Sequence, residues 1–168
     1  MSTGLDAIQE AFLAWSETSG KQMEQARRYL PGGDTRTTAH YLPYPIFMKR
    51  GDGCRIYDIN DNPYIDFMNN FTTLILGHAH PAVVKAVTEQ VKLGTAYAAP
   101  TESQVALAGI ICERVPSIDQ LRFCSSGSEA TMMTIRAACA FTGRHKVMKL
   151  EGGYNGNHDI GEISLIPI

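Results

Sequence analysis

Residues 123–130 read FCSSGSEA; across them an apolar stretch ends, small residues turn the chain, and a helix pattern begins. A helix N-terminus offers backbone N–H groups without intrahelical partners and the positive end of the helix dipole, so this junction suits a phosphate. The hydroxyls of Ser126 and Ser128 can add donors, and Gly127 lets an anion approach the backbone. An ordinary helix cap, serine followed by glutamate in the first turn, explains the same residues, and the spacing alone leaves both interpretations open.

The segments around this junction alternate between strand and helix patterns. Strands are predicted over 120–124 and 145–150, and helices over 128–142, over 101–115 and from Pro81 onward. The helix after the junction is apolar on nearly every face, so we expect it to be buried. Helices that alternate with strands predict crossover connections, a mostly parallel sheet and therefore an α/β fold.

The last residues, 162–168, have the pattern of a further apolar strand, with no polar tail and no closing helix. An open sheet that stopped there would have an unpaired apolar edge. We therefore expect the chain to be the front part of a longer protein.

The first 75 residues have a different pattern from the rest. Apolar residues at helical spacing predict one long or two short helices, with a break near 16–20 and an end at 30–33. Short alternating runs over 46–50, 54–58 and 64–67, joined by tight turns, then predict an antiparallel meander. The change of pattern divides the chain into residues 1–75 and 76–168.

Composition excludes several classes of function. A formal net charge of −2 argues against nucleic-acid binding by bulk positive charge, and no apolar run approaches the length of a membrane span. Four cysteines without a Cys-x-x-Cys pair, and no secretory signal, indicate a cytoplasmic protein. The sequence has no Walker A loop, Gly-x-Gly-x-x-Gly, Gly-x-Ser-x-Gly or His-Glu-x-x-His.

Three further places could carry chemistry. Tyr154, in the glycine-rich stretch 151–158, offers a flat face for a ring, although a mobile surface loop explains it as well. Arg36 lies in the glycine-containing loop 31–36 and could bind a carboxylate, or it could be a solvated surface charge. His78 and His80 lack a third ligand at a recognisable spacing, so a turn into a helix is expected there and no metal site.

Taken in order, the motifs from about Ala26 to Asp159 resemble those of the class III aminotransferases, pyridoxal 5′-phosphate enzymes of fold type I. The nearest branch is that of glutamate-1-semialdehyde aminomutase and the β-amino-acid aminotransferases. The motifs that carry the resemblance are Pro31-Gly32-Gly33, Gly51-Asp52-Gly53, Tyr57-Asp58, Tyr64-Ile65-Asp66, Leu76-Gly77-His78-Ala79-His80-Pro81, Ala99-Pro100-Thr101-Glu102, Ser126-Gly127-Ser128-Glu129-Ala130 and Glu151-Gly152-Gly153-Tyr154.

The resemblance assigns roles to five residues. Ser126, Gly127 and Ser128 match the loop that holds the cofactor phosphate, and Tyr154 matches the aromatic residue that stacks on the pyridine ring. Arg36 matches the carboxylate-binding arginine of β-amino-acid aminotransferases. By resemblance, residues 1–75 begin the small domain and 76–168 begin the cofactor-binding large domain.

The chain departs from the family in three places. Ser128 stands where the family often has threonine, and Asn155 stands where it usually has histidine. In the aminomutase the arginine comes a few residues later, where this chain has Ala39, and this favours a transaminase.

The function implied by the resemblance is a transaminase that moves an amino group between an amino acid, such as a β-amino acid, and a keto acid. Glutamate-1-semialdehyde 2,1-aminomutase is the alternative, and a catalytically dead remnant or half of a split enzyme is a second one. The cofactor-bearing lysine of the family has no match among these residues, so no catalytic residue is assigned here. By resemblance, a homodimer is expected of the complete enzyme, with small-molecule substrates and neither nucleic acid nor membrane as a partner.

Overall fold

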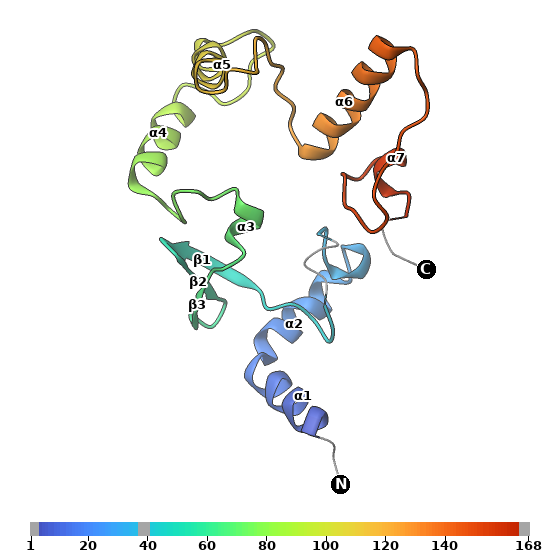
Figure 1. Cartoon of the computed structure of the whole chain (residues 1–168). Coiled ribbons are helices and arrows are strands. Elements are labelled where there is room, and N and C mark those ends of the chain that lie inside the picture. The colour runs from blue at the N-terminus through green and yellow to red at the C-terminus, as the bar shows by residue number, and fades with distance from the viewer. Residues whose placement is uncertain (1–3, 37–40, 165–168) are drawn as a thin grey trace. The chain divides into compact units, whose positions relative to one another are not determined.

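The computed structural model describes residues 4–36 and 41–164 (Figure 1). The chain divides into two units, Met1–Ala96 and Tyr97–Ile168. Packing in this chain thus divides after residue 96, and the domain boundary near residue 75 stays a prediction. In the described part of the chain, no helix has the length and apolar character that crossing a membrane requires.

The first unit opens with two helices, α1 (Gly4–Trp15) and α2 (Glu17–Ala26), so the predicted break is confirmed at Ser16. At the end of α1, the Phe12 carbonyl accepts from both the buried Ser16 hydroxyl at 2.6 Å and the Ser16 N–H at 2.9 Å. A 3-10 turn, η1 (Pro31–Gly33), ends the helical region as predicted.

The three-stranded meander is confirmed with small shifts in its bounds. It consists of β1 (Met48–Asp52), β2 (Arg55–Asp58) and β3 (Pro63–Ile65), in the order β1-β2-β3 with antiparallel pairing throughout. Tight connections between neighbouring strands favour this pairing, since antiparallel strands need no crossover.

The buried carboxylate of Asp58, at the end of β2, holds the turn into β3. One oxygen accepts from the N–H groups of Asn60 and Asn62, both at 2.9 Å, and the other accepts from Asn62 Nδ2 at 2.8 Å and the Tyr64 hydroxyl at 2.9 Å. Burial alone would raise the pKa of Asp58, but these hydrogen bonds outweigh it and hold the pKa below its ordinary value. Burial and the Asp58 charge in turn raise the pKa of Tyr64.

The segment after the meander returns to the β1–β2 turn. Gly53 and His78 exchange two backbone hydrogen bonds of 2.9 and 2.8 Å, and a Cβ on Gly51 would overlap the His78 ring. His78 Nε2 lies 2.7 Å from Asp66 Oδ2, so this imidazole is fixed at the foot of the predicted helix from Pro81, observed as α4 (Pro81–Val91).

The helices of the second unit are confirmed as α5 (Glu102–Arg114) and α6 (Gly127–Thr142), and a short helix, α7 (Asp159–Glu162), follows. The strands predicted over 120–124 and 145–150 are wrong, because neither segment pairs with another strand in the described part of this unit. The strand predicted over 162–168 is wrong at its start, where α7 ends, and residues 165–168 lie outside the described residues. The observed sheet is therefore antiparallel, and the expected parallel sheet does not form among the described residues.

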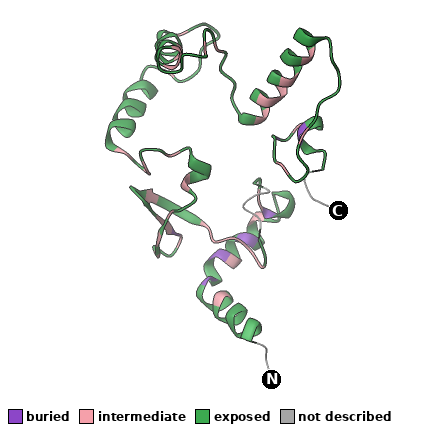
Figure 2. Ribbon diagram, viewed as in Figure 1, coloured by how far each residue is buried: buried purple, intermediate pink, exposed green. Residues whose placement is uncertain are grey.

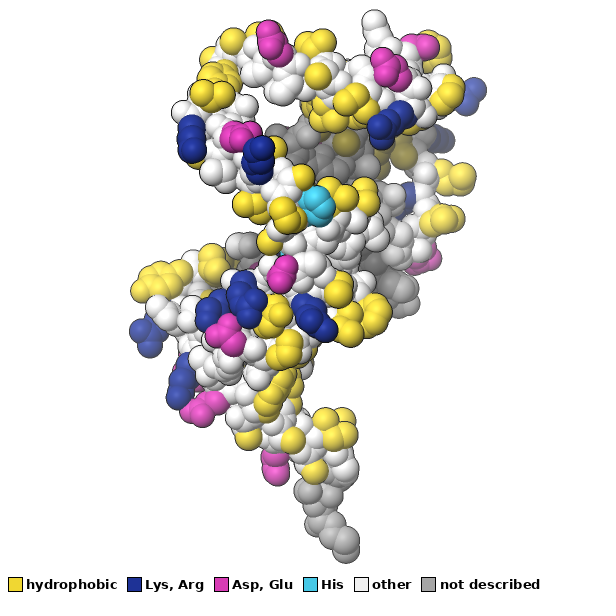
Figure 3. Space-filling model, turned by 90° about the vertical axis from the view of Figure 1, so that its left-hand side faces the viewer, with side chains coloured by type: hydrophobic (Ala, Val, Ile, Leu, Met, Phe, Trp, Pro, Cys, Tyr) yellow, Lys and Arg dark blue, Asp and Glu magenta, His cyan; other side chains and the backbone are white. Residues whose placement is uncertain are grey.

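Burial is sparse in both units. Among the described residues, the buried ones are Ser16, Ser19, Met23 and Gly33 around α2, Asp58 at the end of β2, Gly156 before α7 and Gly161 within it, and most of the ribbon in Figure 2 is coloured as exposed. The described residues of α6 include no buried side chain, so the prediction that it is buried is wrong: without a sheet beneath it, α6 contacts α7 and the glycine-rich stretch before α7. Hydrophobic side chains accordingly lie on the surface in Figure 3, and the valines of α4 are about half exposed.

The Asp66 carboxylate makes the stability of the first unit depend on pH. The hydrogen bond from His78, together with the N–H groups of Asn69 and Met68, lowers the pKa of Asp66 from 3.8. A depressed pKa in the folded state stabilises the fold above the ordinary aspartate pKa, and that contribution is lost as the pH falls through the folded value.

We predict that Asp66→Asn lowers the free energy of unfolding at neutral pH by about 1 kcal/mol, since charged hydrogen bonds are replaced by neutral ones. The difference from the wild type should shrink below about pH 4, as measured by urea denaturation at a series of pH values. Asp119→Asn, at an exposed aspartate of the second unit, is the matched control. A difference that stays constant down to about pH 2 would contradict the role of the charge.

Candidate functional site

The start of α6 is a complete helix cap. The Ser126 hydroxyl accepts from the Glu129 N–H at 3.2 Å, and the Glu129 carboxylate accepts from the N–H groups of Ser126 and Ser125 at 3.1 and 2.7 Å. The ordinary cap that the sequence left open is therefore present.

The cap leaves several donors unused at the same place. The N–H groups of Gly127 and Ser128 are the first of the helix and have no intrahelical acceptor. The hydroxyl oxygens of Ser126 and Ser128 each accept one N–H, which leaves both O–H hydrogens available to donate. A Cβ on Gly127 would meet nothing within 4 Å, so the backbone is open to a ligand. Capping and anion binding are compatible here.

The glycine-rich stretch returns to this helix start. The Asn157 N–H donates to the Ser128 hydroxyl at 2.9 Å, and the Thr131 hydroxyl lies 2.9 Å from the Asn155 carbonyl and 3.1 Å from His158 Nε2. Gly156, between these contacts, is buried and has a φ of 96°. The structure thus brings together two motifs that are separate in the sequence.

Gly156 is the contact point between the stretch and the helix. A Cβ there would lie 2.8 Å from Ser128 Cα and 2.9 Å from the Thr131 hydroxyl oxygen. Sequence analysis missed Thr131 as a part of the site, and it singled out the stretch 151–158 without assigning a role to Gly156, Asn157 or His158. Glycine next to Tyr154 was the available signal, but a glycine does not indicate which backbone it approaches.

Tyr154 directly precedes this contact region, and 58% of its surface is exposed. Asn155, which replaces the usual histidine, donates from its side chain to the Gly153 carbonyl at 3.1 Å, while its own carbonyl accepts from Thr131. Both hydrogen bonds fix the backbone beside Tyr154, so this half-exposed tyrosine lies on a braced turn.

Arg36 belongs to the first unit. The Asp34 carboxylate accepts from the N–H groups of Thr35 and Arg36 at 2.6 and 3.0 Å, which fixes the backbone at the arginine. The Arg36 guanidinium donates through Nη1 to the side-chain oxygen of Asn70 at 2.7 Å. Arg36 and the α6 site therefore lie in different units, each with its own internal contacts.

Asn70 lies in α3 (Asn69–Thr72), a single turn in which all four residues have positive φ, from 46° to 69°. It is therefore a left-handed turn, a conformation that L-residues adopt rarely and that concentrates at functional sites.

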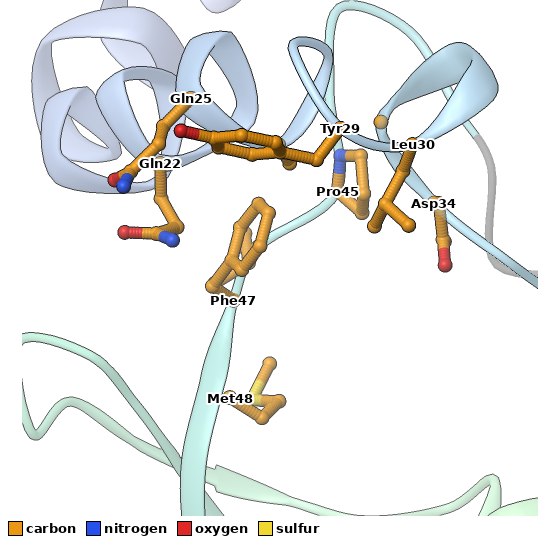
Figure 4. A pocket seen from close by; sticks show the side chains of 11 residues that line it. Gln22, Gln25, Tyr29, Leu30, Asp34, Pro45, Phe47 and Met48 are labelled. Carbon is orange, nitrogen blue, oxygen red and sulfur yellow. The ribbon is translucent and has the colours of Figure 1, made fainter.

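Two other features of the described residues stand apart from the five predicted site residues. His78 and His80 belong to no group of three or more side chains that could hold a metal among those residues. A mostly apolar hollow of about 460 Å³ lies between α2 and the start of β1, bordered by Tyr29, Leu30 and Phe47 (Figure 4). None of the five predicted site residues borders it.

Residues 37–163 match the family model described as aminotransferase class-III. This chain belongs to the class III aminotransferases. The family predicted from the ordered motifs is therefore confirmed, and its enzymes use pyridoxal phosphate.

Relatives of this class III aminotransferase chain include both activities of the predicted branch. A glutamate-1-semialdehyde 2,1-aminomutase of Methanothermobacter thermautotrophicus is 46% identical over 141 residues, covering 84% of this chain and 34% of the relative. The solved omega-transaminase from Sphaerobacter thermophilus is 48% identical with a TM-score of 0.84, covering 88% of this chain and 34% of that one. The solved beta-phenylalanine aminotransferase from Variovorax paradoxus is 37% identical with the same TM-score of 0.84 and the same coverage, 88% and 34%. The likeness to both transaminases confirms the predicted fold, which is a part of the α/β fold of the pyridoxal-phosphate transferases. The chain spans about a third of the length of these relatives.

We predict that Gly156→Ala detaches the stretch 151–158 from α6, because the new Cβ would press on Ser128 Cα, a backbone atom that cannot turn away. Hydrogen exchange at the Asn157 N–H should accelerate by about tenfold or more. Gly152→Ala is the matched control, since Gly152 also has a positive φ, 73°, but its Cβ would meet nothing within 4 Å. Equal acceleration in the two variants would mean that backbone conformation, and not the close contact, governs the stretch.

Proposed function

We propose that the protein carrying this sequence is a pyridoxal-phosphate-dependent transaminase that moves an amino group between an amino acid, such as a β-amino acid, and a keto acid. The observation that carries the proposal is the braced donor set at the start of α6, in a chain of the class III aminotransferase family. When bound, the cofactor supplies the electron sink that makes the amino group transferable.

The residues at α6 fit the phosphate of this cofactor. Two N–H groups without an acceptor among the described residues, from Gly127 and Ser128, and two hydroxyls, from Ser126 and Ser128, form a set made only of donors to an anion. The positive end of the helix dipole adds to the attraction. These residues would hold the phosphate and leave the chemistry to other groups.

Tyr154 would stack on the cofactor ring. Its ring is exposed, and the backbone beside it is fixed to the same helix that would hold the phosphate. A flat, accessible aromatic face at the end of a braced turn can pack against a planar heterocycle with little loss of conformational freedom.

Arg36 would bind the substrate carboxylate. A guanidinium presents two parallel N–H groups to a carboxylate, and this pairing gives direction as well as charge. The beta-phenylalanine aminotransferase among the relatives acts, by its name, on a carboxylated β-amine, which supports this substrate class.

A glutamate-1-semialdehyde 2,1-aminomutase is the second candidate, favoured by the relative that is 46% identical. The two activities differ in one requirement: a transaminase needs a separate keto acid to accept the amino group, whereas an aminomutase returns it to the same molecule. A catalytically dead remnant, or half of a split enzyme, would perform neither reaction.

The remaining parts of the proposal follow from the family. We propose a cytoplasmic homodimer, with residues 1–75 in the small domain and 76–168 in the cofactor domain. Because the chain spans about a third of its relatives, we propose that the cofactor-bearing lysine belongs to the part of the family's length that it does not span.

The test uses protein expressed from the complete reading frame that contains this sequence. Amino-group loss from a β-amino acid that requires added keto acid would support the transaminase. Turnover of glutamate 1-semialdehyde without an acceptor would favour the aminomutase instead. Absence of both reactions in protein that carries the cofactor would overturn the proposal.

Arg36→Ala in that protein should raise the KM for amino acids on the order of 100-fold, because a charged two-pronged contact is lost. The KM for amines that lack a carboxylate should change by less than about threefold. Arg28→Ala, which removes another exposed arginine, is the control and should leave both values unchanged. A similar rise for both substrate classes in Arg36→Ala would contradict a carboxylate contact.

A further inference from the structure

We propose that Asn70 is a positioning residue that aims the Arg36 guanidinium at the substrate carboxylate. The inference rests on the proposed function, since it concerns the carboxylate-binding role of Arg36. It adds to that role a residue whose part in the site the sequence does not indicate.

The contact between the two side chains is short and non-local. Arg36 Nη1 lies 2.7 Å from Asn70 Oδ1, the distance of a charge-assisted hydrogen bond. The other end of the Asn70 amide donates from Nδ2 to the Thr73 hydroxyl oxygen at 2.9 Å, and that hydroxyl donates to the Asn70 carbonyl at 2.9 Å. The amide is thereby held with its oxygen toward the arginine.

The backbone beneath Asn70 is equally constrained. All four residues of α3 are left-handed, and asparagine is among the few residues that tolerate this conformation. The Asp66 carboxylate accepts from the N–H groups of Met68 and Asn69 at 3.0 and 2.8 Å, at the entrance of the turn. The turn therefore presents a carboxamide from a fixed position.

A neutral acceptor suits this task. Asn70 takes one of the five N–H donors of the guanidinium and leaves the positive charge intact. A carboxylate at position 70 would compete with the substrate for the same charge. The nearby Asp34 carboxylate instead accepts from backbone N–H groups, and no ion pair of Arg36 occurs among the described residues. The arrangement fixes one edge of the guanidinium and keeps donors for a carboxylated substrate.

The experiment uses four variants of the protein from the complete reading frame. Asn70→Gly removes the carboxamide but keeps a residue that accepts a φ of 46°. Asn69→Gly is the matched control, because it makes the same change at the neighbouring residue, φ 47°, whose side chain has no hydrogen bond to Arg36 among the described residues. Asn70→Asp adds a competing charge, and Arg36→Ala removes the guanidinium itself.

Two readouts are measured: the KM for amino acids against carboxylate-free amines, and the inhibition constant of butyrate, a carboxylate without an amine. Asn70→Gly should raise the butyrate constant and the KM for amino acids about fivefold, with the KM for amines changed less than about twofold. Asn70→Asp should raise both carboxylate readouts further, while Asn69→Gly leaves them unchanged.

Two results would overturn the inference in distinguishable ways. If Arg36→Ala weakens butyrate inhibition and Asn70→Gly does not, the positioning role is wrong and the role of Arg36 stands. If neither variant affects butyrate inhibition, the carboxylate role of Arg36 in the proposed function is wrong as well, and Asn70 has nothing to position.

Discussion

The carboxylate of Asp66 connects the β-meander to both segments that follow it. One oxygen lies 2.7 Å from His78 Nε2, which fixes the entrance to α4 against the β1–β2 turn. The other accepts from two backbone N–H groups where the left-handed turn of α3 begins. Since Asn70 lies in that turn and contacts Arg36, a single carboxylate, whose side chain is 8% exposed, supports both the docking of α4 and the place of the proposed substrate-binding residue.

The second unit uses the same kind of support at the start of α6. Backbone donors and hydroxyls are divided among three tasks, capping the helix, holding the glycine-rich stretch, and remaining open to an anion. Serine and threonine suit such a division, because one hydroxyl can accept and donate at once. The cap therefore coexists with the proposed phosphate site.

Local patterns in the sequence predict the longer helices, the break at Ser16, the meander and the cap well, because each depends on residues near in the chain, whereas the short α3 and α7 are not predicted. The strands over 120–124 and 145–150 fail for the opposite reason: a strand requires hydrogen bonds from another strand, and an apolar run does not encode its partner. The burial predicted for α6 is wrong for the same reason, because it required a sheet of these strands against the helix.

The site residues likewise fall into those that local motifs predict and those that depend on distant contacts. Ser126, Gly127, Ser128, Tyr154 and Arg36 are found because ordered motifs carry them, and their roles stay proposals. Asn70 and Gly156 act through partners that are distant in the chain, Arg36 and Ser128, so no local pattern reveals them. Only the folded backbone brings these pairs within contact.

The hydrogen bond from Asn157 to Ser128 has a thermodynamic consequence. Its acceptor is the same hydroxyl that is proposed to donate to the phosphate, and a hydroxyl that accepts one hydrogen bond becomes a stronger donor in another. Closure of the stretch 151–158 on α6 and occupation of the anion site would then favour each other by equal free energies, as linkage requires. The two halves of the proposed cofactor site would assemble as one cooperative unit.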